Sequence, residues 1–87
     1  MKRLAESPEL RVKVYSMTNS LYQGNAYALS AVNKVGPIDI LPGHANLISI
    51  LDHCVLSIDS AKGTKDLQIQ KGLLIVSSNE IVIFVDI

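Results

Sequence analysis

The sequence predicts a small all-β domain, a flattened sandwich or barrel of about 8–10 short strands. Apolar and polar residues alternate at a period of two along several segments, and no segment keeps a helical period over three turns. Turn-forming Gly, Pro, Asn and Asp residues interrupt the chain about every 8–12 residues. The length of 87 residues suits one domain.

The strands follow from these patterns in chain order. In "LRVKVYS", Leu10, Val12 and Val14 alternate with Arg11 and Lys13, as in a strand with one solvated face. A similar alternation runs through "AYALSAVN", "VLSID" and "KDLQIQK". The runs "GLLIVS" and "EIVIFVDI" are continuously apolar, which is typical of strands covered on both faces.

Turn residues separate the predicted strands. Pro42 and Gly43 favour a sharp turn, because proline fixes φ and glycine frees the next position. Asn79 in "SSNE" can take a positive φ. Further turns are expected at residues 20–25 around Gly24, at residues 33–37 around Gly36, and at a hairpin tip around Gly63. We expect residues 1–9 to be a flexible extension and residues 10–87 to form a single β-sandwich domain.

Composition argues against several functions. Eight Lys and Arg residues balance eight Asp and Glu residues, so there is no cationic excess for nucleic acid or anionic lipid. Cys54 is the single cysteine, so no intrachain disulfide can form, and we interpret it as a buried, inert thiol. No apolar run approaches the roughly 20 residues that span a bilayer.

Catalytic and metal-binding patterns are sparse, and we expect no cofactor. His53 and Cys54 are adjacent, so in a strand they point to opposite faces and cannot readily share a metal ion. No glycine-rich phosphate loop precedes a helix. Asp39 and His44 flank one turn and could approach each other, which leaves a small hydrolase as one hypothesis. An oxyanion-hole signature is lacking.

Three segments together resemble a known family. "GPIDILPGHANL" (residues 36–47) is similar to the "LPGHA" signature in the N-terminal β domain of the F-type ATP synthase epsilon subunit, called delta in mitochondria. "LYQG" (residues 21–24) resembles that family's early turn, and residues 72–85 resemble its closing segment. The resemblance rests on the order and spacing of the three, and covers nearly the whole chain.

The resemblance implies a non-catalytic central-stalk subunit that links the gamma subunit to the membrane c-ring and transmits torque in proton-coupled ATP synthesis. It places the chain at the energy-coupling membrane (on the cytoplasmic side in bacteria), with membrane contact only through the complex. It implies a gamma-facing surface at Ser16, His44 and Ser49. It also implies structural roles for Gly36, Pro42 and Gly43, and a c-ring-facing loop at Asn33, Lys34, Val35, Pro37 and Asp39.

The chain departs from the family pattern in that loop. The family often has a pattern like E-G-E there, where this chain has Val35, Gly36 and Pro37, so Lys34 or Asp39 would have to supply any ionic contact with the ring. Most members continue into a C-terminal helical hairpin that can block rotation and in some members binds ATP. The present sequence stops where that hairpin would begin, so we expect no bound nucleotide. The alternative hypothesis is a stand-alone β-sandwich module recruited to another protein partner.

Overall fold

The computed structural model describes residues 9–87 and contains nine β-strands within them. The strands are β1 (Leu10–Tyr15), β2 (Ser20–Ala26), β3 (Ala28–Asn33), β4 (Gly36–Ile40), β5 (Leu47–Leu51), β6 (Cys54–Ser60), β7 (Gly63–Ile69), β8 (Lys71–Ser77) and β9 (Glu80–Asp86). Except for Glu9, the predicted N-terminal extension lies outside the described residues. No helix in residues 9–87 is long and apolar enough to cross a membrane.

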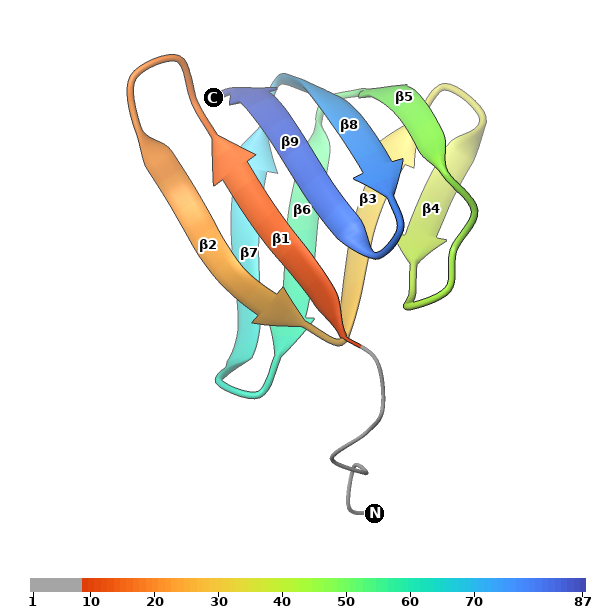
Figure 1. Cartoon of the computed structure of the whole chain (residues 1–87). Coiled ribbons are helices and arrows are strands. Elements are labelled where there is room, and N and C mark those ends of the chain that lie inside the picture. The colour runs from red at the N-terminus through yellow and green to blue at the C-terminus, as the bar shows by residue number, and fades with distance from the viewer. Residues whose placement is uncertain (1–8) are drawn as a thin grey trace.

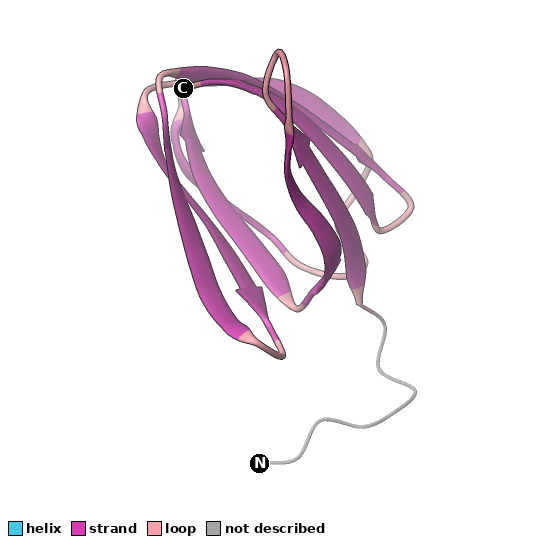
Figure 2. Ribbon diagram, turned by 90° about the vertical axis from the view of Figure 1, so that its left-hand side faces the viewer, coloured by secondary structure: helices cyan, strands magenta, loops and turns pink. Residues whose placement is uncertain are grey.

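The strands form one curled sheet. Its order is β2-β1-β9-β8-β5-β3-β6-β7, with β4 paired to β3. β1 runs parallel to β9, and every other pairing is antiparallel. In Figure 1, β1, β2, β8 and β9 lie in front of β3, β6 and β7, and the turned view of Figure 2 shows the two layers facing each other. The predicted small all-β sandwich is therefore confirmed.

An aliphatic core lies between the two layers. Leu10, Val12 and Val14 of β1 are buried, as their alternation predicts. Leu29 and Ala31 contribute from β3. The described residues include no buried polar or charged side chain, so the interior is held mainly by burial of apolar surface. The remaining core residues are Ala26, Ile40, Leu51, Leu56, Ile58, Ile69, Leu74, Val76, Ile81, Ile83 and Val85.

Three turns have the predicted conformation. His44 donates its backbone N–H to the carbonyl of Leu41 at 3.0 Å, which closes a turn over Pro42 and Gly43. Gly43 has φ of 87°, as position i+2 of a type II turn requires. Asn79, with φ of 67°, follows Ser78, with φ of 50°, in the β8–β9 hairpin. Two successive positive φ values match the type I′ turn. Gly63 follows the tip of the β6–β7 hairpin.

Two predicted loops are wrong. Residues 20–25 are strand β2, not a turn. The polar side chains of residues 20–25 suggested a turn. However, β2 is an edge strand of the sheet and can expose polar groups to solvent. Residues 36–40 form β4, so the loop expected over residues 33–39 is reduced to the turn at Lys34 and Val35.

The apolar runs of β8 and β9 are not covered on both faces, contrary to expectation. In β8, Leu74 is buried and Leu73 is exposed; in β9, Ile83 is buried and Phe84 is exposed. The reason is geometric. Residues 9–87 build two layers, so each strand of the curled sheet has one face toward the core and one face outside.

Candidate protein-binding face

Apolar side chains run in transverse rows across the outside of four neighbouring strands. The register pairs Tyr15 with Phe84, Phe84 with Leu73, and Leu73 with Ile50, which crosses β1, β9, β8 and β5. A second row joins Val82, Ile75 and Ile48. We call this surface the outer apolar face, and it consists of Tyr15, Ile48, Ile50, Leu73, Ile75, Val82 and Phe84.

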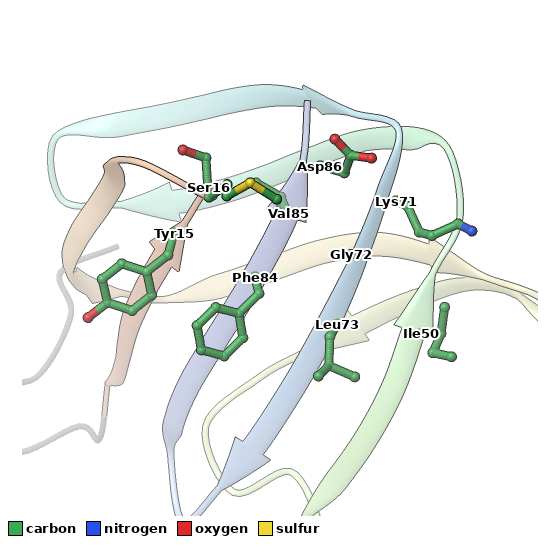
Figure 3. Close-up of a pocket in the computed structure, with 10 residues that line it drawn as sticks. Tyr15, Ser16, Ile50, Lys71, Gly72, Leu73, Phe84, Val85 and Asp86 are labelled. Atoms are coloured by element: carbon green, nitrogen blue, oxygen red, sulfur yellow. The ribbon is translucent and has the colours of Figure 1, made fainter.

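The outer apolar face is exposed to solvent, and two of its aromatic rings stack on each other. Ile48 is 72% exposed, Ile50 60% and Phe84 48%. The rings of Tyr15 and Phe84 stack with centroids 5.7 Å apart and an interplanar angle of 26°. Figure 3 shows the side chains of Tyr15, Phe84 and Leu73 projecting to the same side of the sheet. A contiguous apolar surface of this kind is typical of a site that another molecule covers.

One end of the outer apolar face contains a shallow pocket, which we call the hollow. It has a volume of about 490 Å³ and includes Phe84, Leu73 and Ile50 among its lining residues. Met17, which is 97% exposed, also lines it. Polar groups sit at its edge: Ser16 comes from the loop after β1, and Lys71 of β8 and Asp86 of β9 are neighbours in the strand register. An apolar centre with a polar rim is the common anatomy of protein–protein interfaces.

The other outer surface of the sandwich is polar by comparison. Ser30 donates a 2.8 Å hydrogen bond to Asp39, and Ser57 donates a 2.8 Å hydrogen bond to Asp66. Ser30 and Ser57 are register partners in β3 and β6, so one polar row crosses β4, β3, β6 and β7. The two outer surfaces therefore differ in chemistry, and the apolar one is the stronger candidate for binding a protein.

The residues expected to face gamma do not share one surface. Ser16 borders the hollow, and its hydroxyl accepts the backbone N–H of Asn19 at 3.1 Å. His44 lies in the β4–β5 loop, where its Nδ1 is 2.7 Å from the carbonyl oxygen of Ala45. Because a carbonyl only accepts, Nδ1 carries the proton in this contact. Ser49 is on the opposite side of β5 from Ile48 and Ile50.

Ser49 and Asn33 are brought together, although they were predicted for two different surfaces. Asn33 Nδ2 donates a 3.1 Å hydrogen bond to Ser49 Oγ. Asn33 Oδ1 also accepts the backbone N–H groups of Val35 at 2.9 Å and Gly36 at 3.2 Å. Asn33 thus fixes the β3–β4 turn from within, whereas Lys34, Val35 and Pro37 are exposed there.

Asp39 and His44 are not joined into a catalytic pair. In the described residues, the Asp39 carboxylate accepts from Ser30, and the His44 ring contacts Ala45. Cys54 is a free, half-buried thiol packed against the core. Residues 9–87 contain no group of three or more His, Cys, Asp or Glu side chains that could hold a metal ion.

The members of the outer apolar face were missed by sequence reasoning, which assigned both faces of β8 and β9 to the core. The sequence does contain a signal for them. A continuously apolar strand has two apolar faces. A domain of 87 residues with short strands forms a single core, which can bury one of these faces. The second face must then be solvent-exposed or covered by another molecule.

The fold and the outer apolar face define a class of protein: a small β-sandwich domain with one apolar outer surface. The family described as "ATP synthase, Delta/Epsilon chain, beta-sandwich domain" matches residues 9–87. The chain therefore belongs to the ATP synthase delta/epsilon family, whose epsilon subunits are non-catalytic.

Individual relatives agree with this assignment. The ATP synthase epsilon chain of Ruthia magnifica subsp. Calyptogena magnifica is 32% identical over 77 residues, which are 88% of this chain and 56% of that protein. The epsilon chain of Prochlorococcus marinus (strain AS9601) is 27% identical over 77 residues, 88% of this chain and 58% of that protein. The chain thus spans little more than half the length of these curated relatives.

Two solved structures share the fold. A chain in the Euglena gracilis mitochondrial ATP synthase OSCP/F1/c-ring structure superposes with a TM-score of 0.82 at 14% identity, covering 98% of this chain and 57% of that chain. A chain in the Tetrahymena thermophila mitochondrial ATP synthase central stalk and c-ring structure gives a TM-score of 0.78 at 17% identity, covering 92% and 65%.

Proposed function

We propose that this chain is a non-catalytic central-stalk subunit of an F-type ATP synthase, which links the gamma subunit to the c-ring and transmits torque during proton-coupled ATP synthesis. The outer apolar face of β1, β9, β8 and β5 binds gamma. The turn at Lys34 and Val35 faces the ring. The complex places the chain at the periphery of the energy-coupling membrane.

The observation that carries the proposal is the outer apolar face in a chain of this family. Ile48 and Ile50 are more than half exposed and Phe84 is nearly half exposed, although all three lie within strands. Covering them with an apolar partner surface removes this area from water, which is the main favourable term in association. A non-catalytic subunit needs such a surface, because its function is to hold other subunits.

Torque transmission needs a body that resists deformation, and the continuous strand pairing of the sheet supports this role. Each pairing from β1–β9 through β9–β8 to β8–β5 extends over five or more register partners. The outer apolar face is therefore built on a continuous hydrogen-bonded sheet. The β3–β4 turn is tied to β5 by the bond from Asn33 to Ser49. A force applied at this turn reaches the gamma-binding face through β5.

Ser16, His44 and Ser49 contribute to gamma binding in different ways. Ser16 borders the hollow at the end of the outer apolar face. His44 precedes β5 on the same loop that leads into Ile48. Ser49 points to the other side of β5, where it accepts from Asn33, so we propose that it acts by holding the β3–β4 turn.

The experiment is reconstitution of the stalk from purified parts. The full chain is mixed with the gamma subunit of its own source, and the product is added to the c-ring in lipid nanodiscs. Size-exclusion chromatography should show a complex of chain and gamma, which then elutes with the ring. If the folded chain binds neither gamma alone nor the c-ring in the presence of gamma, the proposed function is refuted.

A further inference from the structure

Met17 is an apolar side chain that the fold leaves almost entirely in solvent. It is 97% exposed, although methionine is among the residue types most often buried in protein interiors. It lies in the loop between β1 and β2 and lines the hollow together with Phe84, Leu73 and Ile50. Met17 therefore brings a thioether to the end of the outer apolar face and adds almost no buried area to the core.

The loop that carries Met17 is constrained by hydrogen bonds between its ends. The backbone N–H of Ser16 donates to the carbonyl of Asn19 at 2.8 Å. The Ser16 hydroxyl accepts the backbone N–H groups of Asn19 at 3.1 Å and of Thr18 at 3.4 Å. Met17 is the one apolar residue among residues 16–19. The loop backbone is thus held beside the hollow, while the unbranched Met17 side chain can adapt to the surface of a partner.

Oxidation changes the apolar character of a methionine side chain. The thioether sulfur attacks one oxygen of hydrogen peroxide, the O–O bond breaks, and the remaining hydroxide takes the proton of the transferred oxygen and leaves as water. The sulfur loses two electrons and becomes a sulfoxide, while the peroxide is reduced. The exposure of Met17 gives peroxide access to its side chain. Enclosing the resulting polar group against an apolar surface without a hydrogen bond is unfavourable.

We propose that oxidation of Met17 to the sulfoxide by hydrogen peroxide weakens the binding of this chain to gamma, and that reduction of the sulfoxide restores it. The inference rests on the proposed function, because the hollow belongs to the surface assigned to gamma, and it adds a means of regulating that surface. Since Met17 lies outside the core, the oxidised chain stays folded.

The test measures gamma affinity before and after treatment of the free chain with peroxide. The full chain is oxidised alone, the peroxide is removed, and peptide mass spectrometry establishes that Met17 has gained one oxygen atom. Isothermal titration calorimetry with gamma of the same source should then show roughly tenfold weaker binding, because the interface encloses a sulfoxide. Methionine sulfoxide reductases, which reduce the two sulfoxide epimers, should restore the affinity. The melting temperature should not change.

Two variants assign the effect to Met17. Met17→Leu is apolar and has no thioether, so its gamma affinity should be the same before and after peroxide. This variant retains Met1 and Cys54, a half-buried thiol packed against the core, and therefore reports any effect of oxidising those two residues. Met17→Gln places a polar group there without an oxidant and should bind gamma more weakly than Met17→Leu.

The contrary results differ in meaning. Full gamma affinity in a chain whose Met17 is completely oxidised would overturn the inference and leave the proposed function intact. An equal loss of affinity in peroxide-treated Met17→Leu would also overturn it, because Met1 or Cys54 would then be responsible. If the untreated chain does not bind gamma, the proposed function fails and the inference fails with it.

Discussion

The backbone N–H of Gly43 donates a 2.7 Å hydrogen bond to Oδ1 of Asn79, 36 residues away in sequence. A second bond runs in the opposite sense, from the backbone N–H of Ser78 to Oδ1 of Asn46 at 3.0 Å. Together they join the β4–β5 loop to the β8–β9 turn. The loop that contains His44 is thereby attached to strands that form the outer apolar face.

Replacing Asn79 separates its two roles, hydrogen bonding and a positive φ of 67°. Asn79→Gly keeps the backbone conformation and loses the acceptor, so it should lower the free energy of unfolding by about 0.5–1.5 kcal/mol. Asn79→Ala should cost about 1 kcal/mol more, since it adds left-handed strain. Urea denaturation measures both. Unchanged stability in Asn79→Gly would show that the bond to Gly43 contributes nothing.

Gly43 provides a test of the turn itself. With φ of 87°, Gly43→Val should destabilise the domain by about 1–3 kcal/mol, because a β-branched residue is strained there. The cause is conformational and not a clash, since a Cβ at this position would meet nothing within 4 Å. Gly43→Asn is the control, because Asn tolerates positive φ better. Equal melting temperatures for the two variants would contradict this explanation.

Two adjacent residues of β9 test the division between core and surface. Ile83 is fully buried and Phe84 is 48% exposed. Ile83→Asp should unfold the domain, because it buries an unpaired charge. Phe84→Asp should leave a folded domain, as measured by far-UV circular dichroism and thermal melting. A folded Ile83→Asp variant would mean that β9 does not contribute to the core in this register.

The fold was largely predictable because most strands carry their own local pattern. The alternation of Leu10, Val12 and Val14 and the turn residues Gly43 and Asn79 all act over a few positions. The strand at residues 20–26 was missed for a different reason. A polar strand at the edge of a sheet has the same composition as a loop, and only its pairing with β1 identifies it.

The candidate site was less predictable, because it depends on register between strands far apart in sequence. Tyr15 meets Phe84, and Ile50 meets Leu73, only after four strands have paired. Local patterns also cannot show that Asn33 reaches Ser49. The family resemblance supplied partner identities, and the structure supplied the surface through which we propose they bind.

The most direct measurement is gamma binding by two matched glutamate variants. Ile50→Glu changes the outer apolar face, where Ile50 is 60% exposed; Val55→Glu changes β6 on the opposite outer surface, where Val55 is 48% exposed. Both should fold, because both sites are solvent-exposed. Affinity for gamma, measured by isothermal titration calorimetry, should fall at least tenfold for Ile50→Glu, since a charge would be buried in the interface, and should be unchanged for Val55→Glu. Full gamma affinity in Ile50→Glu would contradict the assignment of the outer apolar face to gamma.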